Sequence, residues 1–142
     1  MTTAHDTLLF DVLRARAVEV VLRAHGRGEA LSLVLVNRSG EVVSVVGDDH
    51  ATARRTATRR ARAAASLGMS TADVSARVRG ASILRGGSAS DVGPGGVPVY
   101  LEGRLVGAFG VAGDDLAQDT FLAEEARAAS VRPLAAQLPR AA

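Results

Sequence analysis

The chain has 142 residues, which is enough for one domain with its own hydrophobic core. It contains no cysteine, so disulfide bonds and cysteine-ligated metal sites are excluded, and its apolar runs fall well short of the roughly 20 residues that span a bilayer. All basic residues are arginines, and these 17 are nearly balanced by 15 acids, for a net charge of +2. The small excess argues against a nucleic-acid partner.

Residues 1–11 carry acids and no basic segment, so they do not read as a secretory signal peptide. We therefore expect a cytoplasmic protein without membrane contact. Apolar residues at helical spacing predict a first helix over residues 7–24. Two short apolar runs, 31–37 and 41–46, flank a glycine-containing turn and predict a β-hairpin. Alanine and arginine, both strong helix formers, predict a second helix over 50–67.

The second half of the chain continues the alternation of helices and hairpins. A capping-box pattern at residue 70 predicts a short helix to about residue 78, and five glycines mark a loop over 86–96. Apolar runs at 97–101 and 104–112 predict a second hairpin, and a last helix is expected to reach about residue 129.

Hairpins separated by helices are typical of an α+β fold, in which helices pack on a mainly antiparallel sheet. We expect a single domain over residues 1–132. Two prolines, at positions 133 and 139, predict a flexible tail over residues 133–142.

The second helix carries five arginines that divide between two faces. On a helical wheel, Arg54, Arg55, Arg59 and Arg62 share one broad face, which we interpret as solvated in preference to a nucleic-acid surface. Arg60 lies on the opposite side among small residues. A guanidinium buried there must be paired, either with a protein carboxylate or with a carboxylate or carbonyl of a ligand.

A glycine-rich segment, Gly-Pro-Gly-Gly-Val-Pro, occupies residues 93–98 just before the second hairpin. It is not a phosphate-binding loop, because no lysine follows and a strand comes next in place of a helix. Its backbone N–H groups can bind an anion or a carbonyl oxygen, and a plain turn explains the glycines equally well.

Four stretches of the chain together resemble one known family. They are Gly-Gly-Val-Pro at 95–98, Val-Gly-Ala-Phe-Gly-Val-Ala-Gly at 106–113, Gln-Asp at 118–119, and Arg-Ala-Arg-Ala-Ala at 60–64. This pattern resembles the GlcG/HbpS-like haem-binding family. The resemblance implies a profilin-like domain that forms a homo-oligomer, and a ligand that in some relatives is haem or a related tetrapyrrole.

The sequence departs from the family pattern at three positions. Arg60 replaces a lysine, Ala63 a threonine and Ala112 a serine. Arginine keeps the positive charge but is a poor metal ligand because it is always protonated. The departures remove two hydroxyl groups from the implied pocket and leave room for a different organic ligand, such as an acidic one held by Arg60.

The predicted ligand-binding residues come from the second helix and the second hairpin: Arg60, Gly95, Gly96, Val97, Pro98, Tyr100 and Phe109. A haem iron needs an axial ligand, and the candidates near this site are His50 and Tyr100. For His50 we prefer the interpretation of a plain surface residue at the start of the helix.

Two functions follow as hypotheses. The first is a small-ligand-binding homo-oligomer that holds haem or a related organic molecule. The alternative is a cofactor-independent enzyme that performs acid–base chemistry such as isomerisation, cyclisation or elimination. Its candidate catalytic residues are Arg60, His50 and Asp119, although for Asp119 we prefer the interpretation that it caps or orients the last helix. A nucleic-acid binder ranks last.

Overall fold

The computed structural model describes residues 4–47, 51–73, 76, 93–113 and 116–137. Seven helices and strands are bounded within these residues. In chain order they are α1 (Ala4–Gly26), β1 (Leu31–Asn37), β2 (Val42–Gly47), α2 (Ala51–Leu67), β3 (Gly96–Leu101), β4 (Arg104–Gly113) and α4 (Leu116–Gln137).

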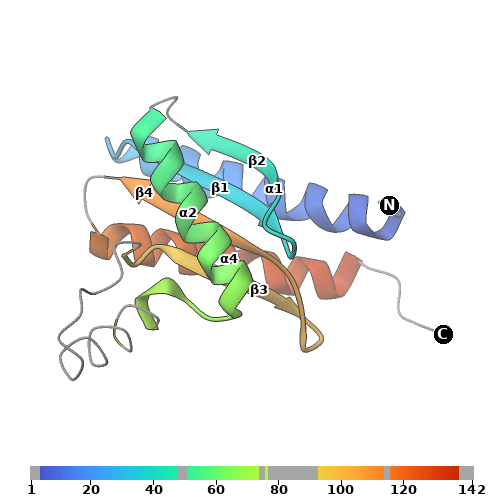
Figure 1. Cartoon of the computed structure of the whole chain (residues 1–142). Helices are drawn as coiled ribbons and strands as arrows, with labels where there is room; N and C mark the ends of the chain where they lie inside the picture. The colour runs from blue at the N-terminus through green and yellow to red at the C-terminus, as the bar shows by residue number, and fades with distance from the viewer. Residues whose placement is uncertain (1–3, 48–50, 74–75, 77–92, 114–115, 138–142) are drawn as a thin grey trace, which may run out of the picture.

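The four strands form one sheet in the order β2-β1-β4-β3, and every neighbouring pair is antiparallel. Helix α2 crosses one face of this sheet, while α1 and α4 lie side by side on the other (Figure 1). The arrangement confirms the expected α+β fold with a mainly antiparallel sheet. Both edges of the sheet are strands from the two hairpins, because each hairpin places its outer strand at a rim.

The two faces of the sheet have unlike cores. The face under α1 and α4 is filled by large side chains, among them Phe109, Leu13 and Leu33, all with no exposed surface. The face under α2 is filled mainly by alanines. Small side chains let α2 approach the sheet closely, and Gly110 of β4 lies directly beneath the backbone of Ala57 and Ala61.

The strand and helix boundaries agree with the expected ones to within a residue for both hairpins and for α2. Helix α1 starts three residues earlier than expected. The expected end of the last helix near residue 129 is wrong, because α4 continues through Pro133 to Gln137. A proline removes one backbone hydrogen bond from a helix, but its φ angle is compatible with helical backbone, so it does not have to end one.

Two of the expected segments are described only in part. Residues 71–73 and 76 are helical, in line with the short helix expected from residue 70, and its remaining positions lie outside the described residues. Most of the expected glycine loop over 86–96 also lies outside them, as do the last five residues of the expected tail. Among the helices that the structure describes, none combines the length and the apolar character needed to cross a membrane.

Candidate functional site: a buried arginine and a basic groove

Arg60 points from the middle of α2 into the interior of the protein. Its side chain is 7% exposed, and its Nη1 atom donates hydrogen bonds to the backbone oxygen of Val111, at 2.7 Å, and to Oδ2 of Asp119, at 2.9 Å. Asp119 is itself 2% exposed and lies in the first turn of α4. Of the partners expected for Arg60, the structure shows a protein carboxylate and a protein carbonyl.

The two hydrogen bonds of Arg60 link three elements from different layers of the protein. Arg60 comes from α2 on one face, Val111 from β4 within the sheet, and Asp119 from α4, which packs on the other face. A charged hydrogen bond between buried groups is strong, and each group is costly to bury without the other. The pair therefore acts first as a structural link between the layers.

The glycine-rich segment packs directly against Arg60. A Cβ atom at Gly95 would lie 3.1 Å from the Nη1 atom of Arg60 and 2.6 Å from the oxygen of Val111, and the φ of Gly95 is +125°. A Cβ atom at Gly93 would lie 3.4 Å from the Nη2 atom of Arg60. Glycine is thus required at position 95 for both backbone conformation and close approach.

The N–H groups of this segment are used within the protein. The N–H of Gly96 donates to the hydroxyl of Thr71 at 2.8 Å, and Thr71 is buried. The backbone oxygen of Gly95 accepts from the N–H of Val111 at 2.9 Å. Of the two interpretations of the glycines, an anion-binding turn and a packed turn, these contacts favour the packed turn at Gly96.

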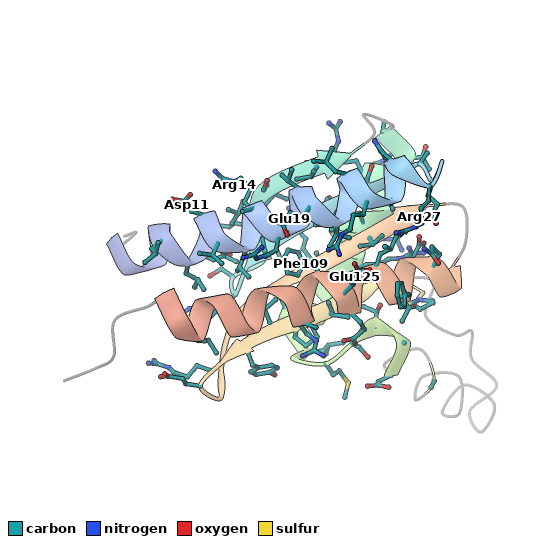
Figure 2. All side chains as sticks on the ribbon, turned by 180° about the vertical axis from the view of Figure 1, so that it is seen from behind. Asp11, Arg14, Glu19, Arg27, Phe109 and Glu125 are labelled. Atoms are coloured by element: carbon teal, nitrogen blue, oxygen red, sulfur yellow. The ribbon has the colours of Figure 1, made fainter. Side chains whose placement is uncertain are left out.

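The other predicted ligand-binding residues lie on both faces of the sheet. Val97 and Phe109 are buried in the core under α1 and α4; Figure 2, drawn from that side, labels Phe109 between the two helices. Tyr100 is 41% exposed, and its hydroxyl donates to the backbone oxygen of Gly68 at 2.7 Å, just beyond the end of α2. Pro98, two residues earlier on β3, is half-buried.

The sheet therefore separates Phe109 from Arg60, although both were expected to line one site. Arg60, Gly95 and Gly96 are brought together on the α2 side, and Tyr100 also reaches that side through its bond to Gly68. His50 lies outside the described residues. No group of three or more histidine, cysteine or acidic side chains in the described part of the chain could hold a metal ion.

Two contacts of this region were not found by sequence reasoning. Thr71 was noted only as part of a helix-capping pattern, yet its hydroxyl anchors Gly96 across 25 positions of sequence. The pairing of Arg60 with Asp119 spans 59 positions. The only signal in the sequence was the type of residue. A buried arginine requires an acidic partner, but the sequence does not identify which acid it is.

The remaining arginines of α2 line an open groove on the other side of that helix. The groove has a volume of about 460 Å³ and runs between α2 and β2. It is lined by Val42, Val45, Arg54, Arg55, Thr58, Arg59 and Arg62. The arginine face of α2, which was interpreted from the sequence as solvated, thus borders a concave surface that also includes Val42 and Val45.

The fold is similar to ORFY of Klebsiella pneumoniae, with 23% identity, a TM-score of 0.69, and coverage of 87% of this chain and 88% of that chain. It is similar to the protein in a PduOC–haem complex, with 23% identity, a TM-score of 0.67, and coverage of 89% and 93%. It is also similar to a double mutant of HbpS from Streptomyces reticuli, with 24% identity, a TM-score of 0.72, and coverage of 90% and 86%.

At these identities the similarity concerns the fold. No curated protein matches the sequence. A family model does match the sequence. It covers residues 11–128, which is most of the chain, and its description is "Haem degrading protein HbpS-like". The resemblance noted in the sequence motifs is confirmed by this match: the chain belongs to the HbpS-like family.

Proposed function

We propose that this protein binds haem or a related small organic molecule that carries acid groups, at the edge of the sheet formed by β3. Membership of a family described as haem degrading supports the proposal, as does the similar fold of a protein whose structure contains haem. The observation that carries it is the position of Tyr100, an oxygen donor held at an exposed edge strand.

The residues present fit such a ligand in one respect and not in another. A haem iron takes a histidine, cysteine, methionine or tyrosine as its axial ligand. Tyr100 is 41% exposed and would hold the iron through its phenol oxygen, giving up its hydrogen bond to Gly68. Arg60 does not fit as an iron ligand, because arginine stays protonated and Asp119 already pairs with it.

Arg60, Gly95 and Gly96 are positioning residues in this proposal. They hold the chain that leads into β3 against α2, through the contacts of Gly95 with Arg60 and of Gly96 with Thr71. Pro98, two residues before Tyr100 on the same strand, is half-buried. Val97 and Phe109 fill the core behind the strand and support it from the other face.

Titration of the purified protein with hemin tests the proposal, with the Soret band as the readout. We expect a saturable Soret shift that Tyr100→Phe abolishes, because phenylalanine keeps the ring and removes only the oxygen. Phe121→Leu is the control, since Phe121 is 60% exposed on α4, which packs on the sheet face opposite α2, whereas the Tyr100 hydroxyl bonds Gly68 at the end of α2.

His50 is the competing axial ligand from the sequence. If His50→Ala abolishes the shift and Tyr100→Phe leaves it intact, the assignment of the iron to Tyr100 is wrong, while haem binding itself stands. If the unaltered protein gives no saturable shift, haem binding is rejected.

The enzyme alternative ranks second. Arg60 and Asp119 bind each other in the interior, which leaves neither side chain exposed to a substrate. Assembly into a homo-oligomer and a cytoplasmic location stay predictions that rest on the sequence and its resemblance.

A further inference from the structure

The groove between α2 and β2 combines positive charge with an apolar floor. Its guanidinium groups come from four arginines of α2, and its apolar part comes from Val42 and Val45 of β2, which are 42% and 43% exposed. Among the described residues that line it, none is acidic. A partner that fits both parts must carry acids next to apolar groups.

The charge on this side of α2 is unusual for a helix. The helix contains five arginines and no acid, and its first turn lacks the acidic residue that would complement the helix dipole. Arg55, Arg59 and Arg62 follow one another at intervals of four and three residues, which places their side chains along one side of the helix.

The floor of the groove is an edge strand that carries no charged residue and no proline. Edge strands expose unpaired backbone N–H and C=O groups, and proteins commonly guard them with charged residues or proline. β2 reads Val-Val-Ser-Val-Val-Gly and contains neither. Figure 1 shows β2 at the rim of the sheet, and α2 packs mainly on β4, β1 and β3.

The register of β2 shows which of its side chains face α2. Val42 pairs with Val36 and Val45 with Val34, and both partners belong to the alanine-rich core beneath α2. Val42 and Val45 therefore stand on the α2 side of the sheet, beside the arginines. The Nε of Arg62 donates to the backbone oxygen of Gly40 at 2.9 Å, which ties the helix to the turn that starts β2.

We propose that β2 is a docking edge for an extended acidic segment of another protein, which adds to the sheet as a fifth strand. Strand addition would satisfy the free backbone groups of β2. Alternate side chains of the added strand would point toward α2, where carboxylates would meet the guanidinium groups of Arg55, Arg59 and Arg62. The proposal is independent of haem binding, which involves the opposite edge of the sheet.

Two other occupants fit the surface less well. A second copy of this chain, paired through β2, would bring two identical sets of arginines to the joint, and like charges brought together oppose association. A single-stranded nucleic acid would satisfy the charges but not the backbone groups of β2, and the lining has no aromatic side chain on which bases stack.

A binding experiment with the full chain tests the proposal. The probe is a fluorescent synthetic peptide of six residues, the length of β2, in which glutamate alternates with valine. We expect saturable binding by fluorescence anisotropy, weakened about tenfold by Arg55→Ala/Arg59→Ala, a factor that corresponds to about 1.4 kcal/mol for the loss of two charged contacts. Arg14→Ala/Arg104→Ala removes equal charge elsewhere and should change the affinity less than about twofold.

Two modified peptides separate strand pairing from simple charge attraction. A peptide with glutamine in place of glutamate keeps the backbone, and a peptide N-methylated at alternate residues keeps the charge but cannot pair as a strand; both should bind weakly. Val45→Asp, a change at a half-exposed site, should also abolish binding while circular dichroism shows the fold intact.

Four results would overturn the proposal. They are absence of binding by the acidic peptide, equal binding of either modified peptide, equal loss of affinity in the control double variant, and tighter binding of a single-stranded DNA of the same charge. The last result would assign the groove to nucleic acid.

Discussion

At the scale of single residues, the pairing of Arg60 with Asp119 is the most consequential contact of the molecule. Both side chains are almost completely buried and are joined at 2.9 Å. Burial of a charge is tolerated only when an opposite charge compensates for the lost hydration. Removal of one partner is therefore more harmful than removal of both.

We predict that Arg60→Ala lowers the free energy of unfolding by about 3–5 kcal/mol, since it leaves the carboxylate of Asp119 buried without its main cation. The double variant Arg60→Met/Asp119→Leu should lose much less, because it buries no charge. Urea unfolding followed by circular dichroism measures both. A loss below about 1 kcal/mol in the single variant would show that the pair is not structural.

At the scale of elements, the approach of α2 to β4 depends on a glycine within a strand. A Cβ atom at Gly110 would meet the backbone oxygen of Ala57 and come within 2.6 Å of the backbone nitrogen of Ala61. Those atoms belong to the helix backbone and cannot rotate away as a side chain can. Even one methyl group at this position must shift the whole helix.

We predict that Gly110→Ala costs about 1–3 kcal/mol of stability or more, as overpacking of a core does. Gly26→Ala is the matched control, because nothing lies within 4 Å of the Cβ position at Gly26 and its change should stay within about 0.5 kcal/mol. Chemical denaturation of the two variants compares them directly. If Gly110→Ala and Gly26→Ala were equally stable, the close packing of α2 on β4 would not contribute to stability.

At the scale of the whole molecule, stability is divided unequally between the two faces of the sheet. The face under α1 and α4 holds the bulky side chains, including Phe109 with no exposed surface, whereas alanines dominate under α2. Hydrophobic stabilisation scales with the apolar area removed from water. Most of the hydrophobic stabilisation therefore comes from the face under α1 and α4. The buried contacts of Arg60 and the arginine-lined groove lie on the α2 side.

We predict that Phe109→Ala destabilises the protein by about 3–5 kcal/mol, the usual cost of removing a buried aromatic ring. Phe121→Ala removes the same ring from a position that is 60% exposed, and it should cost no more than about 0.5 kcal/mol. Thermal unfolding of both variants checks the pair. Similar costs would contradict the assignment of the main core to the sheet face under α1 and α4.

Much of the fold was predictable because it depends on local chemistry. Periodicity, glycine turns and helix-forming residues located both hairpins and α2 almost to the residue. The motifs at residues 60–64 and 95–119 indicated the family, which the family match confirms. The end of α4 was missed, since Pro133 discourages a helix locally without preventing it.

The kind of contact that Arg60 makes was predictable, but its geometry was not. The sequence by itself determined that Arg60 must be paired, that its helix carries four other arginines on a separate face, and that glycines allow a close approach near residue 95. Only the tertiary structure decided that Asp119 is the partner, that the sheet separates Phe109 from Arg60, and that Val42 and Val45 lie beside the remaining arginines. The physical reason is distance along the chain: these contacts join residues that only the packing of helices on both faces of the sheet brings together.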